Sequence, residues 1–213
     1  MESKLFTPVT FGPLTLRNRT IRSAAFESMC PGNAPSDMLL NYHRSVAAGG
    51  IGMTTVAYAA VTRSGLSFDR QLWMRPEIIP GLRRLTDAVH AEGAAAGIQL
   101  GHCGNMSHKS ICGCTPVGAS GGFNLYSPTF VRGLRADELP ELARAYGRSV
   151  NLAREAGFDA VEIHAGHGYL ISQFLSPATN HRKDEFGGSL QNRMRFMDMV
   201  LEEVMKAAGN DMY

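Results

Sequence analysis

Four stretches of the chain contain short clusters of apolar and β-branched residues that predict strands, and the second of them is an almost continuous run of the kind buried on both faces of a sheet. They span residues 20–26, 52–60, 95–100 and 159–164. Between and after them lie stretches in which apolar residues recur every three to four positions, which indicates amphipathic helices. These helices are predicted at residues 37–48, 76–93, 136–156 and 190–208.

Serine and glycine residues mark the ends of these helices. Ser36 and Ser189 fit the N-cap position, where a hydroxyl accepts a hydrogen bond from a free backbone N–H. Strand and helix therefore alternate four times, which predicts a parallel sheet with helices outside it. The alternation does not distinguish a closed barrel from an open doubly wound sheet. No Gly-x-Gly-x-x-Gly follows the first strand, however, and this disfavours a dinucleotide-binding fold.

Two segments lie outside this alternation. Residues 5–19 carry Pro8, Gly12 and Pro13 between short β-compatible pieces, which predicts an N-terminal β-hairpin that caps one end of the sheet. Residues 101–135 are rich in glycine and proline and show little periodicity, so we expect a long loop without regular structure. Because this loop leaves the third strand at its carboxyl end, it should lie over the active-site face as a lid or binding loop.

The composition limits the classes of function. Of the 213 residues, 44% are hydrophobic and 19% are charged, and the formal net charge is +2, so we expect one globular domain with a sizeable core. The scattered Lys and Arg residues indicate neither a nucleic-acid partner nor a membrane partner. The first residues have no apolar core of signal-peptide length, and no apolar run approaches about 18 residues. These features predict a cytoplasmic protein.

The cysteines are not spaced as a disulfide framework. Three of the four lie within residues 103–114 beside two histidines, which makes a metal cluster conceivable. The Cys-x-Cys spacing differs from the usual two-residue clip, however, and the neighbours are rich in glycine. We therefore interpret the cysteines as free thiols of a reducing compartment, without a metal; they are Cys30, Cys103, Cys112 and Cys114.

The last predicted strand ends in two histidines and a tyrosine. His164 closes the strand, and His167 and Tyr169 follow on a glycine-rich turn. In parallel α/β folds, ligands bind at the carboxyl ends of the strands. Imidazole N–H groups can donate hydrogen bonds to a carbonyl or nitro oxygen, and a phenol that stays protonated at neutral pH can deliver a proton.

Other interpretations of these residues stay open. His164 and His167 could bind a metal ion together with Glu162 or His181, as in a metal-dependent hydrolase of the barrel type. Alternatively, both histidines are satisfied structural residues, and Tyr169 only packs against apolar neighbours.

A family resemblance rests on the residues after this strand. They read His-Ala-Gly-His-Gly-Tyr-Leu-Ile-Ser-Gln-Phe-Leu-Ser-Pro at 164–177 and Asn-His-Arg-Lys-Asp-Glu-Phe-Gly-Gly-Ser at 180–189, followed by Asn192-Arg193. Together with Leu16-Arg-Asn-Arg near the start, they make the chain resemble the Old Yellow Enzyme family of flavin oxidoreductases. This resemblance implies a (β/α)8 TIM barrel that binds FMN. It also implies that the protein uses NAD(P)H to reduce activated C=C bonds of small α,β-unsaturated carbonyl compounds.

The resemblance also implies roles for individual residues. His164 and His167 bind the activating oxygen of the substrate, and Tyr169 donates the proton. The flavin lies against the ends of the first three strands, at Ser23, Ala24, Ala25, Phe26, Ala60 and Gln99. Many family members have Cys or Thr where this chain has Phe26, and some have a tyrosine where it has Ser28. The redox potential and the pocket shape are therefore not carried over from the family.

Only four strand–helix units are present, whereas complete barrels need about 250 residues. We therefore interpret residues 1–213 as a single domain, the first half of an FMN-binding barrel whose C-terminal half is missing. Such a half exposes two strand edges and an inner face, so we expect the isolated chain to hold flavin weakly or not at all. The alternative functions are a catalytically inactive or truncated half barrel and the metal-dependent hydrolase described above. A homo-oligomer is a further expectation for the partners of the chain. An iron–sulfur cluster is expected only in a longer form.

Overall fold

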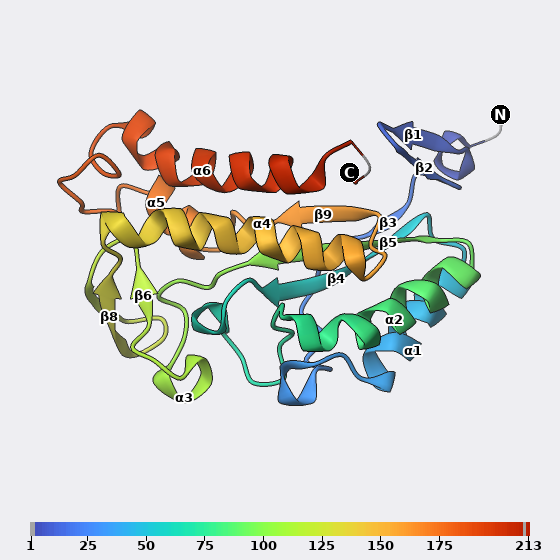
Figure 1. The fold of residues 1–213 in the computed structure, drawn as a ribbon, viewed down its shortest axis with the longest axis horizontal. Helices are drawn as coiled ribbons and strands as arrows, with labels where there is room; N and C mark the ends of the chain where they lie inside the picture. Colours follow the sequence, from blue (N-terminus) through green and yellow to red (C-terminus); the bar gives the residue numbers. More distant parts are fainter. Residues whose placement is uncertain (1–2, 211) are drawn as a thin grey trace.

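A parallel four-stranded sheet forms the centre of the chain (Figure 1). The computed structural model describes residues 3–210, 212 and 213. The strands stand in the order β3-β4-β5-β9, so each crossover places the next strand beside the previous one. The four predicted strands are confirmed, at β3 (Ile21–Arg22), β4 (Met53–Ala60), β5 (Ala95–Gly101) and β9 (Ala160–Ile163).

Four long helices lie side by side against one face of this sheet, with α1 next to α2, α2 next to α4 and α4 next to α6 (Figure 1). The Ser36 and Ser189 hydroxyls each accept a backbone N–H at 3.2 Å, as predicted for N-caps. The helices span α1 (Asp37–Ala48), α2 (Ile79–Ala91), α4 (Leu139–Glu155) and α6 (Leu190–Ala208). None of the helices in the described part of the chain combines the length and the apolar character needed to cross a bilayer.

Shorter helical segments join these elements. The six-residue helix α5 (Leu170–Leu175) follows β9, and five further segments outside residues 101–135 are single turns of 3-10 helix. These turns lie at Lys4–Phe6, Pro31–Asn33, Arg63–Gly65, Pro76–Ile78 and Ala136–Glu138.

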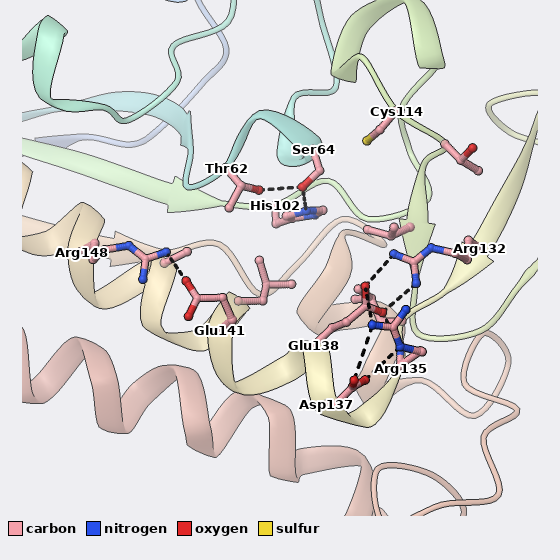
Figure 2. Close-up of a pocket in the computed structure, with 15 residues that line it drawn as sticks. Thr62, Ser64, His102, Cys114, Arg132, Arg135, Asp137, Glu138, Glu141 and Arg148 are labelled. Atoms are coloured by element: carbon pink, nitrogen blue, oxygen red, sulfur yellow. Dashed lines mark hydrogen bonds and ion pairs between the residues drawn. The ribbon is translucent and has the colours of Figure 1, made fainter.

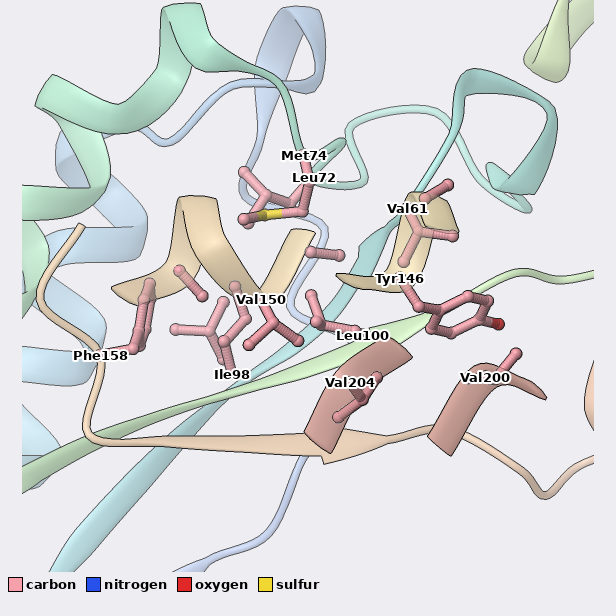
Figure 3. Packing of buried hydrophobic residues seen from close by; sticks show 14 of the residues in the cluster. Val61, Leu72, Met74, Ile98, Leu100, Tyr146, Val150, Phe158, Val200 and Val204 are labelled. Atoms are coloured by element: carbon pink, nitrogen blue, oxygen red, sulfur yellow. The ribbon is translucent and has the colours of Figure 1, made fainter. Parts of the chain in front are cut away.

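The main core lies between the helices and the sheet (Figure 3). Ile98 and Leu100 of β5 are fully buried there against residues of α4 and α6, such as Val150 and Val204. Truncating a buried side chain of this size to alanine costs about 2–5 kcal/mol. This core holds the strands in place and leaves their carboxyl ends free to carry a site.

The opposite face of the sheet is polar and partly open. Gln99 of β5 and Glu162 of β9 occupy paired positions on this face. The antiparallel hairpin of β1 (Val9–Phe11) and β2 (Leu14–Leu16) closes its amino end, because buried Leu16 clusters there with Met53 and Ala160. The predicted N-terminal cap is therefore confirmed.

The first strand is shorter than the predicted range 20–26. Arg22 donates to the Glu27 carboxylate at 2.7 Å and to the Thr55 carbonyl at 2.5 Å. The Glu27 carboxylate in turn accepts the Ala57 N–H at 3.3 Å. The Glu27 carboxylate thus accepts the N–H of β4 that a carbonyl of a longer β3 would otherwise accept. Residues 23–26 therefore leave the sheet as an irregular segment.

The expectation of a structureless loop at residues 101–135 was wrong. The segment contains a short helix and a three-stranded sheet in the order β6-β8-β7. Its strands are too short, at two to five residues, to show a periodic pattern in the sequence. The elements are α3 (Lys109–Cys112), β6 (Val117–Gly118), β7 (Gly122–Asn124) and β8 (Thr129–Gly133).

This small sheet is fastened to the segment that follows α5. Arg182 donates to the carbonyl oxygens of Ala119, at 3.0 Å, and Leu134. The backbone N–H of His181 donates to the Ser120 hydroxyl at 2.9 Å. Residues 101–135, called the insertion from here on, therefore lie beside the carboxyl ends of β5 and β9. This is the side of the sheet where a lid or binding loop was predicted.

Candidate active site

The predicted catalytic residues lie on one turn at the carboxyl end of β9. The strand ends at Ile163, and Tyr169 occupies the N-cap position of α5. Between them, His167 and Gly168 adopt left-handed conformations with φ of 56° and 70°. This conformation is uncommon for residues other than glycine, and strained positions of this kind concentrate at functional sites. The turn places exposed His167 next to buried His164.

His164 and His167 form a hydrogen-bonded pair. The Gly166 N–H donates to His164 Nδ1 at 3.3 Å, and His164 Nε2 lies 3.2 Å from His167 Nδ1. Because Nδ1 of His164 accepts, the neutral ring carries its proton on Nε2 and donates it to His167. His167 then carries its own proton on Nε2, on an exposed ring. The pair can therefore offer an imidazole N–H to an oxygen on this side of the site.

Burial holds His164 in the neutral form. Its side chain is only 7% exposed, and this burial lowers the pKa of His164, with a further contribution from neighbouring His167. The carboxylate of Glu162 acts in the opposite direction. A neutral imidazole has one donor nitrogen and one acceptor nitrogen, so the tautomer described above is available at neutral pH.

Tyr169 lies against His164 and a second tyrosine, Tyr58. The ring centroids are 4.7 Å apart for Tyr169 and His164 and 5.3 Å apart for Tyr169 and Tyr58. Burial raises the pKa of Tyr169 above its usual range, while the nearby Ser67 hydroxyl acts to lower it. The phenol therefore stays protonated at neutral pH, as a proton donor must.

Sequence reasoning missed Tyr58 and Ser67. An aromatic residue within an apolar strand reads as core, and Ser67 lies in a long connection without a motif. Only the fold of the connection after β4 brings them to Tyr169. The single sequence signal was the hydroxyl of Tyr58, because a buried phenol needs a hydrogen-bond partner.

The predicted cofactor residues differ in accessibility. Residues 23–26 form the irregular segment after β3 and are mostly exposed, and Phe26 stacks on Phe68 with ring centroids 4.8 Å apart. Ala60, at the end of β4, is fully buried. Its side chain offers no surface to a ligand, so its assignment rests on the family resemblance alone.

Gln99 lies on the open face of the sheet, and its Nε2 donates to Glu162 Oε1 at 2.5 Å. Its partner is thus a side chain on the next strand rather than neighbouring backbone. A partly exposed amide offers both a donor and an acceptor, the complement of the pyrimidine edge of a flavin. Residues 23–25 have small side chains that allow a planar ring to approach the backbone. This set of residues fits FMN.

Two cavities lie near the strand ends. One, of about 530 Å³, borders His167 and is lined on its far side by residues of the insertion such as Phe123 and Tyr126. No Lys, Arg, Asp or Glu lines it. It therefore suits an uncharged ligand.

The other cavity, of about 750 Å³, lies between α4 and the connections after β4 and β5 (Figure 2). Its rim carries ion pairs rather than free charges, with N–O distances of 2.7 Å for Arg132–Glu138 and 2.8 Å for Arg148–Glu141. It contains none of the predicted site residues, and the charges of its arginines are already matched by carboxylates.

His102 lies at the base of this second cavity and is held by two hydrogen bonds. Its Nδ1 accepts the Gly104 N–H at 3.0 Å, so its Nε2–H donates to the Ser64 hydroxyl at 3.1 Å. Burial lowers the pKa of His102 to about 4. The imidazole therefore acts as a neutral donor to Ser64 and is not placed to take the proton of that hydroxyl.

The structure also addresses the alternative metal site. Among the described residues, 3–210, 212 and 213, no three His, Cys, Asp or Glu side chains come together in a way that could hold a metal ion. Cys112 and Cys114 approach to 3.9 Å between their sulfur atoms but have no third partner of this kind. A metal-dependent hydrolase using His164 and His167 therefore finds no ligand set in this part of the chain.

The family model described as "NADH:flavin oxidoreductase / NADH oxidase family" matches residues 4–213. The chain belongs to this family. It is 44% identical over 206 residues to the 4,4'-dithiodibutanoate disulfide reductase of Rhodococcus erythropolis, a match that covers 97% of this chain and 51% of that protein. It is 37% identical to the NADPH dehydrogenase of Bacillus subtilis (strain 168), covering 96% and 60%.

Solved structures of family members show the same fold. An Old Yellow Enzyme homologue from Zymomonas mobilis matches with a TM-score of 0.91 at 30% identity, over 99% of this chain and 62% of that one. Morphinone reductase matches with a TM-score of 0.90 at 29% identity, over 99% and 63%. The Old Yellow Enzyme resemblance is thus confirmed, and the parallel sheet corresponds to part of a (β/α)8 barrel. The chain spans about half to three fifths of these relatives.

Proposed function

We propose that this chain is the N-terminal part of an FMN-dependent oxidoreductase that uses NAD(P)H to reduce activated C=C bonds of α,β-unsaturated carbonyl compounds. The observation that carries this proposal is the joint placement of His164, His167 and Tyr169 on one turn at a barrel strand end. In this proposal the flavin is held by Gln99, near the carboxyl end of β5, and by residues 23–26, which follow β3. FMN, when bound, supplies the hydride-transfer chemistry.

His164 and His167 bind the oxygen of the substrate and stabilise the negative charge that develops on it. His167 is exposed and has its Nε2–H free to turn toward a ligand, and His164 contributes its own Nε2–H when the 3.2 Å bond between the two rings opens. One positioned donor of this kind is worth about 3–4 kcal/mol in the transition state. The charge-free lining of the adjoining 530 Å³ cavity favours an uncharged carbonyl compound over a carboxylate.

Tyr169 delivers the proton to the carbon atom that becomes saturated. Its raised pKa keeps the phenol protonated at neutral pH. The proton then has to be replaced from solvent. His164 lies against the phenol ring at 4.7 Å between centroids, so the proton donor and an oxygen-binding residue share one rigid cluster.

Further proposals follow from the open face of the sheet and from the free cysteines. Completion of the barrel by a C-terminal half would cover the open face that carries Gln99. We place the protein in the cytoplasm, with small molecules as its partners, and the structure's four free cysteines support a reducing compartment. Homo-oligomer formation is proposed as a way to cover exposed edges of the sheet.

Expression of the 213-residue chain, and of a version extended through a complete barrel, tests this function. Each purified protein is examined for the visible absorption of bound flavin and for NADPH-dependent reduction of cyclohexenone. We expect flavin and activity in the extended form, with little or no flavin in the shorter one. Absence of flavin from both forms would overturn the proposal. Because the Rhodococcus relative is named for reduction of a disulfide, 4,4'-dithiodibutanoate serves as a second acceptor.

A further inference from the structure

Tyr58 reaches the site because β4 is irregular near its end. The parallel ladder between β4 and β5 shifts register between Val56 and Ala59. Irregularities of this kind redirect a side chain and are common next to active sites. Tyr58 belongs to a small buried cluster with Leu66 and Cys103, separate from the main core, and Tyr169 packs against this cluster.

The ring of Tyr58 contacts two of the three proposed catalytic residues. Its centroid lies 5.6 Å from that of His164, in an edge-to-face arrangement, and 5.3 Å from that of Tyr169. Gly101 of β5 makes room for this arrangement, since a Cβ there would lie 2.9 Å from the Tyr58 ring and 3.1 Å from His164 Cβ. Aromatic pairs in such geometry are stabilised beyond the effect of simple burial.

The hydroxyl of Tyr58 is held as firmly as its ring. Its Oη donates to the Gly65 carbonyl at 3.0 Å and lies 3.0 Å from the Ser67 hydroxyl. Gln71 links Ser67 to the backbone of Tyr58, because its Oε1 accepts the Ser67 N–H at 2.9 Å and its Nε2 donates to the Tyr58 carbonyl at 3.2 Å. The Ser67 hydroxyl also lies close enough to Tyr169 to act on the pKa of its phenol. Tyr58 therefore contacts Tyr169 directly through its ring and fixes Ser67 beside it.

We propose that Tyr58 is a positioning residue that fixes the phenol of Tyr169 and the imidazole of His164 relative to each other. At 4% exposure it cannot itself bind a substrate. Its ring supports His164 from one side and Tyr169 from the other, and its hydroxyl orients Ser67. Groups locked by packing and a supporting hydrogen-bond shell need no reordering when the substrate arrives. This inference rests on the proposed function.

Two substitutions separate the contributions of the Tyr58 ring and hydroxyl. Tyr58→Leu removes both, and Tyr58→Phe keeps the ring. Tyr146→Leu is the matched control. Tyr146 of α4 is also buried, but it lies in the main core between the helices and the sheet, and its hydroxyl has no hydrogen-bond partner among the described residues. Each variant is prepared as the FMN-loaded protein, and flavin reduction by NADPH is measured separately from flavin reoxidation by cyclohexenone.

The proposal predicts that Tyr58→Leu slows reoxidation about tenfold or more while flavin reduction stays within about twofold, because only the second step uses Tyr169. Tyr58→Phe should recover most of this loss. Tyr146→Leu should lower stability and leave both steps unchanged. Unchanged reoxidation in folded Tyr58→Leu, or an equal loss in Tyr146→Leu, would overturn the proposal.

A spectroscopic readout keeps this test separate from the test of the proposed function. In protein labelled with ¹³C-tyrosine, the titration of Tyr169 is followed by NMR in wild type and Tyr58→Leu. The titratable groups that surround this phenol are Tyr58, Cys103 and His164. Loss of the support from Tyr58 should move the Tyr169 titration and broaden its signal. If wild type binds FMN yet reduces no enone, the function fails, whereas an unmoved Tyr169 signal in Tyr58→Leu overturns the positioning role alone.

Discussion

Two histidines follow parallel strands in almost the same way, yet they occupy different environments. His102 comes after β5 and His164 after β9, and in each case Nδ1 accepts the N–H of the glycine two residues further on, at 3.0 Å and 3.3 Å. In each case Nε2–H points to another polar side chain. That partner is the Ser64 hydroxyl for His102 and the His167 ring for His164.

The difference lies in what stands beyond the second hydrogen bond. His102 is 1% exposed, and its chain of hydrogen bonds ends at Ser64 and Thr62 on the wall of a cavity whose charges are paired. His164 leads to exposed His167 and packs against Tyr169. Strand-end position alone therefore does not distinguish a functional histidine from a structural one. The proposed role of His164 rests on the accessible donor of His167 and on the neighbouring phenol of Tyr169.

The largest expected effect on the rate of flavin reoxidation comes from removing the Tyr169 hydroxyl. Tyr169→Phe removes the proposed proton donor but keeps the ring contacts, so flavin reoxidation by an enone should slow about 10²- to 10⁴-fold. Reduction of the flavin by NADPH should be unchanged. Stopped-flow absorbance of the flavin measures the two steps separately. An unchanged rate of enone reduction would assign protonation to another group or to water.

The fold and the site differed in how far the sequence predicted them. The four strands, the long helices and the caps at Ser36 and Ser189 follow from periodicity and local hydrogen bonding, which short stretches of sequence contain. The early end of β3 does not follow from such local signals. It depends on the Glu27 carboxylate, which accepts the backbone N–H of Ala57, 30 residues further along the chain. Tyr58 was missed for the same reason, since its role depends on contacts with residues 164–169.

The lowered pKa of His102 should make the stability of the protein depend on pH. The folded pKa of His102 is about 4, against about 6.5 for an ordinary histidine. Below about pH 6.5 His102 therefore binds a proton in the unfolded chain but stays neutral in the folded protein. The free energy of unfolding falls as the pH is lowered toward 4. Between about pH 7.5 and pH 5, His102 should cost about 2 kcal/mol of unfolding free energy.

Urea denaturation of wild type and His102→Asn at both pH values measures this contribution. The asparagine oxygen can accept the Gly104 N–H in place of Nδ1, and the variant has no group to titrate in this range. Its stability should therefore depend less on pH than that of wild type. Equal slopes in the two proteins would show that His102 titrates normally.

A smaller effect is expected at Ser64. Ser64→Ala leaves the Nε2–H of His102 without its acceptor at 3.1 Å, and a buried donor left unpaired costs about 1–3 kcal/mol. Ser64 lines the cavity, so we expect the low end of this range in thermal or urea unfolding. Enone reduction should not change. A loss of activity without a loss of stability would instead place the His102 cavity in the reaction.

The comparison of His164→Asn with His102→Asn tests the central claim most directly. Both variants keep an acceptor for the glycine N–H, and both lose the Nε2–H donor at a strand end. In the FMN-loaded protein, flavin reoxidation by cyclohexenone should slow about 10²- to 10³-fold in His164→Asn, and the rate in His102→Asn should stay within about threefold of wild type. Equal losses in the two variants, or full activity in His164→Asn, would contradict the assignment of the site to the β9 turn.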